Sequence, residues 1–213
     1  MKRFLIVGST SGIGESLKKI AENQGDRIES FSRSNGVDVR EARPEFPELE
    51  EKIDGLVYCP GTINLKPFSS LSIEDFQNDL DVNFLGAVKV IKRYIPSIRN
   101  KGAIVLFSSI AASKGFAFHA STAASKAAVE GFVRSLAQEI APKLRINAIA
   151  PTLTETPLSA FITDDSKKRE ASVKRHPIGR LALPGDIAEL AYFLLSEKAS
   201  MITGAVIPVS GGI

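Results

Sequence analysis

Short apolar runs alternate along this chain with longer segments in which apolar residues recur every three or four positions. The runs are typical of buried strands, and the periodic segments are typical of helices packed through one face. The expected strands cover residues 4–7, 27–31, 37–39, 56–59, 103–107, 145–150 and 205–209. Strands and helices alternate throughout, without a repeat or a linker. The pattern therefore predicts an α/β fold: one domain over residues 1–213, with a doubly wound parallel sheet covered by helices on both faces.

Composition narrows the function classes. A net charge of +3 suits anionic small ligands, and aromatic residues make up only 7%, so a nucleic-acid partner is not expected. No segment has the length of a membrane span, and the N-terminus lacks the apolar region of a signal peptide. The single Cys59 fits a reducing compartment. We therefore expect a cytoplasmic protein with no membrane partner and no metal.

A glycine-rich turn, residues 8–14, follows the first strand and opens a helical segment. Strand, glycine turn and helix is the context of a dinucleotide site, because the helix N-terminus then faces the pyrophosphate. The spacing is G-x-x-x-G-x-G, which differs from the commoner G-x-G-x-x-G. An ordinary glycine turn is the alternative interpretation.

The second strand ends in Ser32-Arg33 and not in the acidic residue that usually binds a ribose 2′-hydroxyl. A serine and an arginine suit a 2′-phosphate, so we expect NADP(H) in preference to NAD(H). A solvated surface arginine is the alternative. The strand expected at residues 37–39 follows with hardly room for a crossover helix, which predicts an open adenine end.

Two further segments precede the main candidate site. Residues 44–53 predict a polar helix, and Cys59-Pro60-Gly61 at the next strand end would let backbone approach a ligand closely. A helix starting at Ser72 then carries Asn83 within an apolar stripe of Phe76, Leu80, Phe84, Val88, Ile91 and Ile95. Asn83 is either a structural amide or the holder of a proton-relay water.

Three polar groups converge near the strand that ends at Phe107. Ser109 follows this strand, while Thr122 and Lys126 lie four residues apart on one face of the next helix. Parallel sheets bind ligands beyond the carboxyl ends of their strands. The segment 152–183, which contains basic residues, is expected to form a mobile lid over a substrate or, alternatively, a solvated helix face.

These motifs resemble the short-chain dehydrogenase/reductase family from Phe4 to Gly212, and most closely its 3-oxoacyl-acyl-carrier-protein reductase branch. The resemblance rests on residues 8–14, Asp81-Val82-Asn83, Ser108-Ser109, residues 125–129, residues 145–151 and the tail from Pro177 to Gly212. It implies a seven-stranded Rossmann-type sheet, a nicotinamide cofactor, a small carbonyl or alcohol substrate, and a homo-tetramer or homo-dimer.

The resemblance also assigns residues to roles. Asn83 matches the relay asparagine, Ser109 the serine that polarises the substrate, and Lys126 the lysine that binds the ribose. The expected cofactor-binding residues are Gly8, Ser9, Thr10, Ser11, Gly12, Ile13, Gly14, Ser32, Arg33, Asp38, Val39, Cys59, Pro60, Gly61, Lys126, Pro151, Thr152, Thr154 and Thr156. The sequence departs from the family pattern at Cys59-Pro60, Thr152 and Ser210, and above all at Thr122, where the family has its catalytic tyrosine.

Thr122 changes the expected chemistry. A phenol can be tuned toward neutrality by a neighbouring ammonium, whereas a threonine hydroxyl is too weakly acidic and too short to replace it. His119, three residues earlier, is a possible substitute acid or a second-layer loop residue. We therefore predict an NAD(P)(H)-dependent oxidoreductase with atypical proton chemistry. The alternative is a cofactor-binding pseudo-enzyme or a partner subunit of an active relative.

Overall fold

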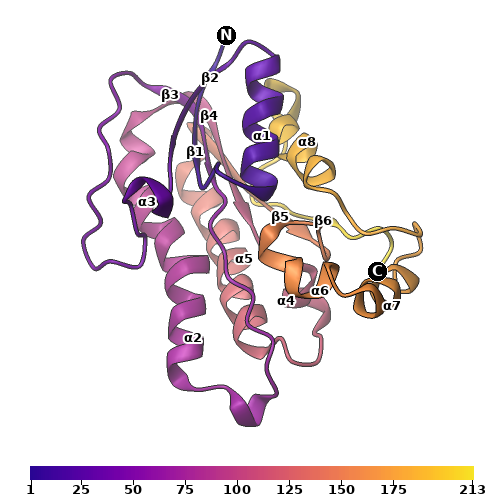
Figure 1. Ribbon diagram of the computed structural model, residues 1–213. Coiled ribbons are helices and arrows are strands. Elements are labelled where there is room, and N and C mark those ends of the chain that lie inside the picture. Colours follow the sequence, from indigo (N-terminus) through magenta and orange to yellow (C-terminus); the bar gives the residue numbers. More distant parts are fainter.

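The computed structural model describes residues 1–213, which fold around one parallel β-sheet (Figure 1). Its six strands run in the order β2-β1-β3-β4-β5-β6. They are β1 (Arg3–Val7), β2 (Arg27–Phe31), β3 (Ile53–Tyr58), β4 (Ile98–Phe107), β5 (Leu144–Pro151) and β6 (Val206–Val209). The order reverses between β1 and β3, so a crevice is expected at the carboxyl ends of these two strands.

Helices cover both faces of the sheet (Figure 1). On one face α1 packs against α8, and on the other lie α3 and α5. The helices are α1 (Gly12–Asn23), α2 (Ile73–Leu80), α3 (Gly86–Tyr94), α4 (Ile110–Lys114), α5 (Ala120–Ile140), α6 (Ala160–Thr163), α7 (Ser166–Lys174) and α8 (Pro184–Leu195). None of them combines the length and apolar content needed to cross a membrane. The predicted doubly wound α/β arrangement is confirmed.

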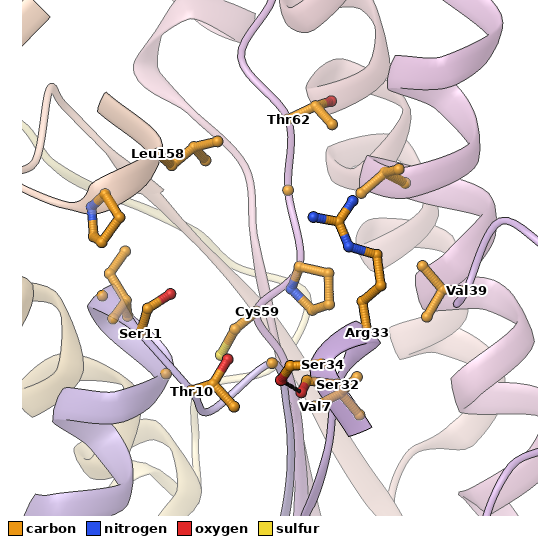
Figure 2. A pocket seen from close by; sticks show the side chains of 18 of the residues that line it. Val7, Thr10, Ser11, Ser32, Arg33, Ser34, Val39, Cys59, Thr62 and Leu158 are labelled. Atoms are coloured by element: carbon orange, nitrogen blue, oxygen red, sulfur yellow. Dashed lines mark hydrogen bonds between the residues drawn. The ribbon is translucent and has the colours of Figure 1, made fainter. Parts of the chain in front are cut away.

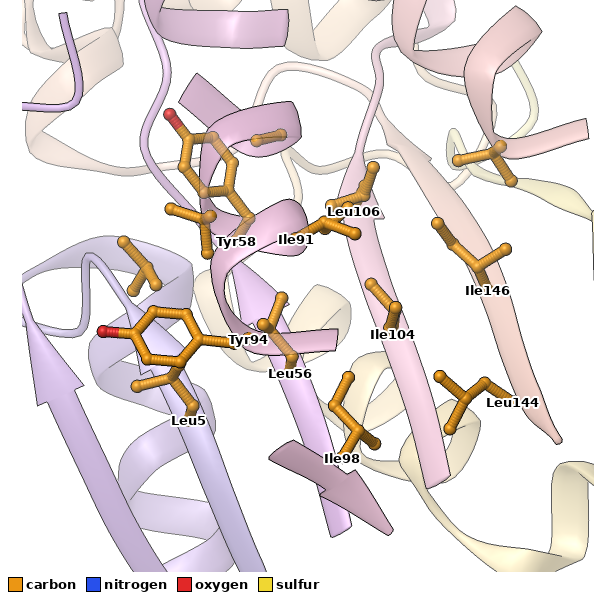
Figure 3. Packing of buried hydrophobic residues seen from close by; sticks show 14 of the residues in the cluster. Leu5, Leu56, Tyr58, Ile91, Tyr94, Ile98, Ile104, Leu106, Leu144 and Ile146 are labelled. Carbon is orange, nitrogen blue, oxygen red and sulfur yellow. The ribbon is translucent and has the colours of Figure 1, made fainter. Parts of the chain in front are cut away.

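The core lies in two layers, one on each side of the sheet. Side chains of Leu56, Ile104 and Ile146 point from three neighbouring strands toward α3 and α5 (Figure 3). Ile91 and Tyr94 on α3 close this layer, and the Tyr94 hydroxyl donates a hydrogen bond to the Pro47 carbonyl at 2.7 Å. Burial of this apolar surface on both faces fixes the sheet and with it the strand ends that carry the site.

The prediction of a seventh strand was wrong. Residues 37–39 form no strand, although Val39 is buried in the core. Only five residues separate this segment from β2, and they contain a short 3₁₀ turn, Arg33–Asn35. A parallel neighbour needs a crossover of about a dozen residues or more, so the segment cannot reach the position beside β2. β2 is therefore the edge of the sheet.

The prediction of a polar helix over residues 44–53 was also wrong. The segment is irregular until Ile53, where β3 begins. Pro47 interrupts any helix there, and the apolar residues Phe46 and Leu49 pack against the core. Phe46 lies 5.6 Å from the Phe31 ring and 6.0 Å from the Tyr94 ring, between ring centroids. Aromatic packing therefore outweighs the polar composition of this segment.

The long helical segment after Ser72 contains a π turn. It opens with a capping box, because Ser72 and Asp75 exchange backbone and side-chain hydrogen bonds. The π turn spans Asp81–Leu85 and separates α2 from α3. The predicted stripe is partly wrong: Asn83 and Ile91 are buried, but Phe76, Leu80, Phe84, Val88 and Ile95 are only half-buried. The other buried side chains of this segment are Asp79, Ala87, Val90 and Tyr94.

Candidate active site

A cavity of about 750 Å³ opens at the carboxyl ends of β1, β2 and β3, at the position where the strand order reverses. Figure 2 shows Thr10 and Ser11 on one side of it, Arg33 and Val39 on the other, and Cys59 between them. Its lining includes most predicted cofactor-binding residues: Gly8, Thr10, Ser11, Gly12, Ile13, Gly14, Ser32, Arg33, Asp38, Val39, Cys59, Pro60, Gly61 and Thr156. Ser9 is buried and does not line it.

The glycine turn has the geometry that a dinucleotide phosphate requires. Gly12 has a φ of +56°, which favours glycine, and a Cβ added at Gly14 would lie 2.2 Å from the Gly8 carbonyl oxygen. Ser11 precedes α1 in an extended conformation and its side chain does not cap the helix. The first N–H groups of α1 are therefore available to an anion. These residues fit the pyrophosphate of a dinucleotide.

Positive charge gathers at the end of this cavity beside β2. The Arg33 guanidinium extends into the cavity (Figure 2) and forms no ion pair with the protein. Arg40 lines the same end and binds both oxygens of Asp38, with the closest contact at 2.6 Å. These hydrogen bonds lower the pKa of Asp38 to about 2, so Asp38 is ionised. Its negative charge is balanced by the Arg40 guanidinium. Arg33 is left as an unpaired cation.

A second cavity, of about 290 Å³, adjoins the first. The two share the lining residues Ile13, Cys59, Gly61, Thr62, Thr156 and Leu158. The second cavity brings together Ser109, Thr122 and Lys126, as the sequence predicted, together with His119. Its lining also holds Pro151, Thr152 and Thr154, which were predicted to bind the cofactor. The smaller cavity, called the chamber below, could hold a small substrate. It adjoins the larger cavity, which has room for a dinucleotide.

Lys126 is buried at the inner wall of this chamber. Its ammonium donates a hydrogen bond to the Phe107 carbonyl at 2.9 Å. Burial lowers the pKa of Lys126 to about 8, and the charge of Asp79 opposes this shift. Burial also raises the pKa of the neighbouring Cys59 thiol to about 12, so Cys59 is neutral and unreactive as a nucleophile at physiological pH. Lys126 therefore places an ammonium at the inner wall of the chamber.

Ser109 keeps a hydrogen-bond donor available. It caps α4, where its Oγ accepts the Ala111 N–H at 3.2 Å. Its own hydroxyl proton has no partner in the protein. Since Ser109 lines the chamber, this proton can be donated to a ligand oxygen.

Asn83 is fully engaged by protein groups. Its Oδ1 accepts the Thr62 N–H at 2.9 Å, and its Nδ2 donates to Ser125 Oγ at 2.9 Å and to Thr62 Oγ1 at 3.1 Å. Asn83 lines neither cavity. The geometry therefore favours the structural interpretation of this amide.

Thr122 occupies the chamber wall with its hydroxyl tied to two groups. Its Oγ1 accepts the Asn64 N–H at 3.0 Å and donates to Asp79 Oδ2 at 3.1 Å. Asp79 is completely buried and also accepts the Thr62 hydroxyl at 2.5 Å. Sequence reasoning missed both Asp79 and Thr62. The available signal was an acidic residue four positions before Asn83, on the same helix face.

The wall formed by the expected lid contains a second threonine with a buried partner. Thr152 Oγ1 lies 2.8 Å from His176 Nε2, and His176 Nδ1 lies 2.7 Å from the Ser172 carbonyl. Because a carbonyl only accepts, Nδ1 carries the proton and Nε2 accepts from Thr152. His176 was not predicted as a site residue, yet it lines the chamber. The segment is folded against the site by this pair.

Comparison with known proteins agrees with this geometry. The chain matches the family model of Enoyl-(Acyl carrier protein) reductase over residues 7–213. It is 31% identical to the 3-oxoacyl-acyl-carrier-protein reductase FabG of Thermotoga maritima, over 100% of this chain and 97% of the relative. The chain belongs to the short-chain dehydrogenase/reductase family. It is therefore related in sequence and fold to oxidoreductases.

Two solved short-chain dehydrogenase/reductase structures carry different cofactors. A small-chain dehydrogenase in complex with NADPH is 28% identical with a TM-score of 0.88, over 99% of this chain and 97% of that chain. The 3-ketoacyl-(acyl-carrier-protein) reductase of Brucella melitensis, complexed with NADH, is 27% identical with a TM-score of 0.84, also over 99% and 97%. The likeness therefore extends to proteins that bind either nicotinamide cofactor.

Proposed function

We propose that this protein interconverts a carbonyl and a secondary alcohol with a nicotinamide cofactor, and that its proton chemistry does not use a tyrosine. The observation that carries the proposal is the position of Ser109 and Lys126. Both line a small chamber that opens directly into a dinucleotide-sized cavity. A carbonyl group in the chamber would lie beside the region where the reactive end of a dinucleotide emerges.

The residues present suit distinct parts of this reaction. When bound, the cofactor supplies or accepts the hydride. The free Ser109 proton would hydrogen-bond the substrate oxygen and polarise it. The Lys126 ammonium would hold the ribose hydroxyls and stabilise negative charge that develops on that oxygen. The 3.1 Å bond from Thr122 to Asp79 gives the chamber a hydroxyl already polarised by a carboxylate.

A panel assay tests this proposal. Oxidation of NADPH and NADH would be followed with a series of ketones, 3-oxoacyl thioesters and keto sugars, and reduction of NADP⁺ with the matching secondary alcohols. We expect turnover of at least one pair, and loss of it in Lys126→Met. Cofactor binding without turnover of any compound would contradict an enzymatic function.

The second candidate function is a pseudo-enzyme that binds the cofactor or supports an active relative. The observation that favours it is Thr122 at the position of the expected tyrosine. Loss of a general acid typically lowers a rate about 10²–10⁴-fold. The panel distinguishes the two candidates, because a pseudo-enzyme would bind NADPH as tightly as an enzyme but would show no turnover above the uncatalysed background.

We further propose that the phosphorylated cofactor is preferred. The unpaired Arg33 guanidinium at the β2 end suits a 2′-phosphate, and no free carboxylate competes there because Asp38 is paired with Arg40. Arg33→Ala is expected to weaken NADPH binding about 10–100-fold, the effect of losing a charge-assisted hydrogen bond of about 1.5–3 kcal/mol. NADH binding is expected to change little.

The measurement is a fluorescence titration of each cofactor with the wild type and the variant. Arg43→Ala is the matched control, since Arg43 is an exposed arginine ten residues further along the chain and does not line the cavity. Equal losses of NADPH and NADH affinity in Arg33→Ala would contradict the assignment of Arg33 to a 2′-phosphate.

A further inference from the structure

Asp79 is a carboxylate with no access to solvent, next to the chamber. Its exposed fraction is 0%, and it lines neither cavity. One carboxylate oxygen accepts the Thr62 hydroxyl at 2.5 Å and the other accepts the Thr122 hydroxyl at 3.1 Å. Burying an ionised carboxyl group is costly, and packing alone would be served equally well by an apolar side chain. Its position therefore calls for a role beyond packing.

The two threonines whose hydroxyls bind Asp79, Thr62 and Thr122, both line a cavity. Thr122 lines the chamber, and Thr62 lines the chamber and the larger cavity. Each threonine oxygen accepts one N–H, from Asn64 at 3.0 Å and from Asn83 Nδ2 at 3.1 Å. A hydroxyl oxygen has two lone pairs, so one lone pair on each threonine remains free. Thr122 therefore has an acceptor position for a substrate proton on one side and a carboxylate for its own proton on the other.

A cation and two hydroxyl donors surround Asp79. Lys126 is near enough to interact electrostatically with Asp79, and its own ammonium hydrogen-bonds the Phe107 carbonyl. The Thr62 and Thr122 hydroxyls both donate to the carboxylate. A carboxylate oxygen that accepts a hydroxyl proton in a hydrogen bond can also take that proton up.

We propose that Asp79 exchanges a proton with the substrate through the hydroxyl of Thr122. This inference rests on the proposed oxidoreductase function and deepens it. During oxidation the alcohol O–H bond breaks, and its proton moves to Thr122 Oγ1 while the Thr122 hydroxyl proton moves to Asp79 Oδ2. The carbinol carbon gives up its hydride to the oxidised nicotinamide, and a carbonyl forms. Solvent later removes the proton through the same hydroxyl, and reduction runs through the reverse steps.

This relay gives oxidation and reduction opposite requirements. Oxidation needs the Asp79 carboxylate as the final proton acceptor, and reduction needs the carboxylic acid as the proton donor. A merely structural Asp79 would be needed in neither of these two roles. Asp79 acts as a positioning residue, because it reaches the substrate only through Thr122.

The test uses the alcohol and ketone that the wild type turns over fastest, with NADP⁺ and NADPH. Asp79→Asn can still bond both threonines and cannot titrate, whereas Thr122→Val removes the connecting hydroxyl and Thr122→Ser retains it. We expect kcat to fall about 10²–10⁴-fold in Asp79→Asn and Thr122→Val and to be largely kept in Thr122→Ser. Asp81→Asn is the matched control, since the Asp81 side chain bonds only to Gln77 Nε2, at 2.9 Å.

A readout independent of turnover accompanies the kinetics. Carboxyl ¹³C NMR of aspartate-labelled protein identifies Asp79 by the signal missing in Asp79→Asn. Its chemical shift distinguishes a carboxylate from a carboxylic acid, so the signal reports proton uptake by Asp79 independently of turnover. NADPH affinity is expected to be unchanged in all variants, which shows that the fold and cofactor site persist.

The possible results separate this inference from the proposed function. If the wild type turns over a substrate but Asp79→Asn keeps its rate and pH profile, the relay is wrong and the oxidoreductase function stands. Loss of rate in Thr122→Ser equal to that in Thr122→Val would also overturn the relay. A wild type that turns over nothing in the panel would overturn the proposed function, and the relay with it.

Discussion

Gly14→Ala is expected to weaken NADPH binding about 100-fold. The new Cβ would lie 2.2 Å from the Gly8 carbonyl oxygen and 3.0 Å from its carbon, so the backbone of the turn would have to move. Overpacking of this kind costs about 1–3 kcal/mol, and each 1.4 kcal/mol that falls on the bound state is a tenfold loss of affinity. The turn cannot yield easily, because Gly8 packs against Pro60 on its other side. Fluorescence titration with NADPH measures the effect.

Gly131→Ala is the matched control for this prediction. Gly131 lies on the exposed side of α5, and a Cβ added there meets nothing within 4 Å. Alanine is about 1 kcal/mol more favourable than glycine inside a helix, so this variant is expected to be as stable as the wild type or more stable, with unchanged NADPH affinity. Normal binding in Gly14→Ala would contradict the role assigned to the turn.

Much of the lining of the larger cavity could be predicted because its signals are local. The glycine spacing of residues 8–14 and the apolar strand before it lie within a dozen residues, and backbone geometry depends directly on them. The convergence of Ser109, Thr122 and Lys126 was also predictable. Helical spacing places two of them on one face, and a strand end places the third beside them.

The edge of the sheet could not be predicted from local pattern. Residues 37–39 have strand-like composition, but the chain between them and β2 is too short to cross over. Residues 44–53 have the polar composition of a surface helix, but they form none, because Phe46 packs against Phe31 and Tyr94. These outcomes depend on tertiary contacts, and the sequence carries no periodicity for them.

Asp79 was missed for a related reason. The apolar pattern followed Phe76, Leu80 and Phe84, although Asp79 lies four residues before Asn83 and therefore on the same helix face. Asp79 is buried because it accepts two hydroxyls that come from distant parts of the chain. Thr122 and Asp79 therefore form one hydrogen-bonded unit. The hydroxyl at position 122 explains how a carboxylate can be buried at position 79.

That pairing leads to the second large effect: Thr122→Tyr, which introduces the tyrosine that the sequence resemblance leads us to expect at this position, should lower stability and not raise turnover. The phenol oxygen lies too far from the Cβ to replace Thr122 Oγ1, so the Asn64 N–H and Asp79 Oδ2 lose their partner. A buried polar group left without a hydrogen bond costs about 1–3 kcal/mol. We expect the free energy of unfolding to fall by about 2–6 kcal/mol for the two groups together, as measured by urea denaturation.

The double variant Thr122→Tyr with Asp79→Leu tests the cause. The double variant removes the unpaired Asp79 carboxylate but leaves the Asn64 N–H without a partner and the Thr62 hydroxyl without an acceptor, so only part of the lost stability should return. A phenol beside the Lys126 ammonium would then have its pKa lowered, and ketone reduction is expected to exceed that of Thr122→Tyr alone. Asp79→Leu alone, in which the Thr122 and Thr62 hydroxyls lose their acceptor, controls for the loss of the carboxylate. If the single Thr122→Tyr variant were as stable as the wild type and faster, the pairing of Thr122 with Asp79 would not constrain this site.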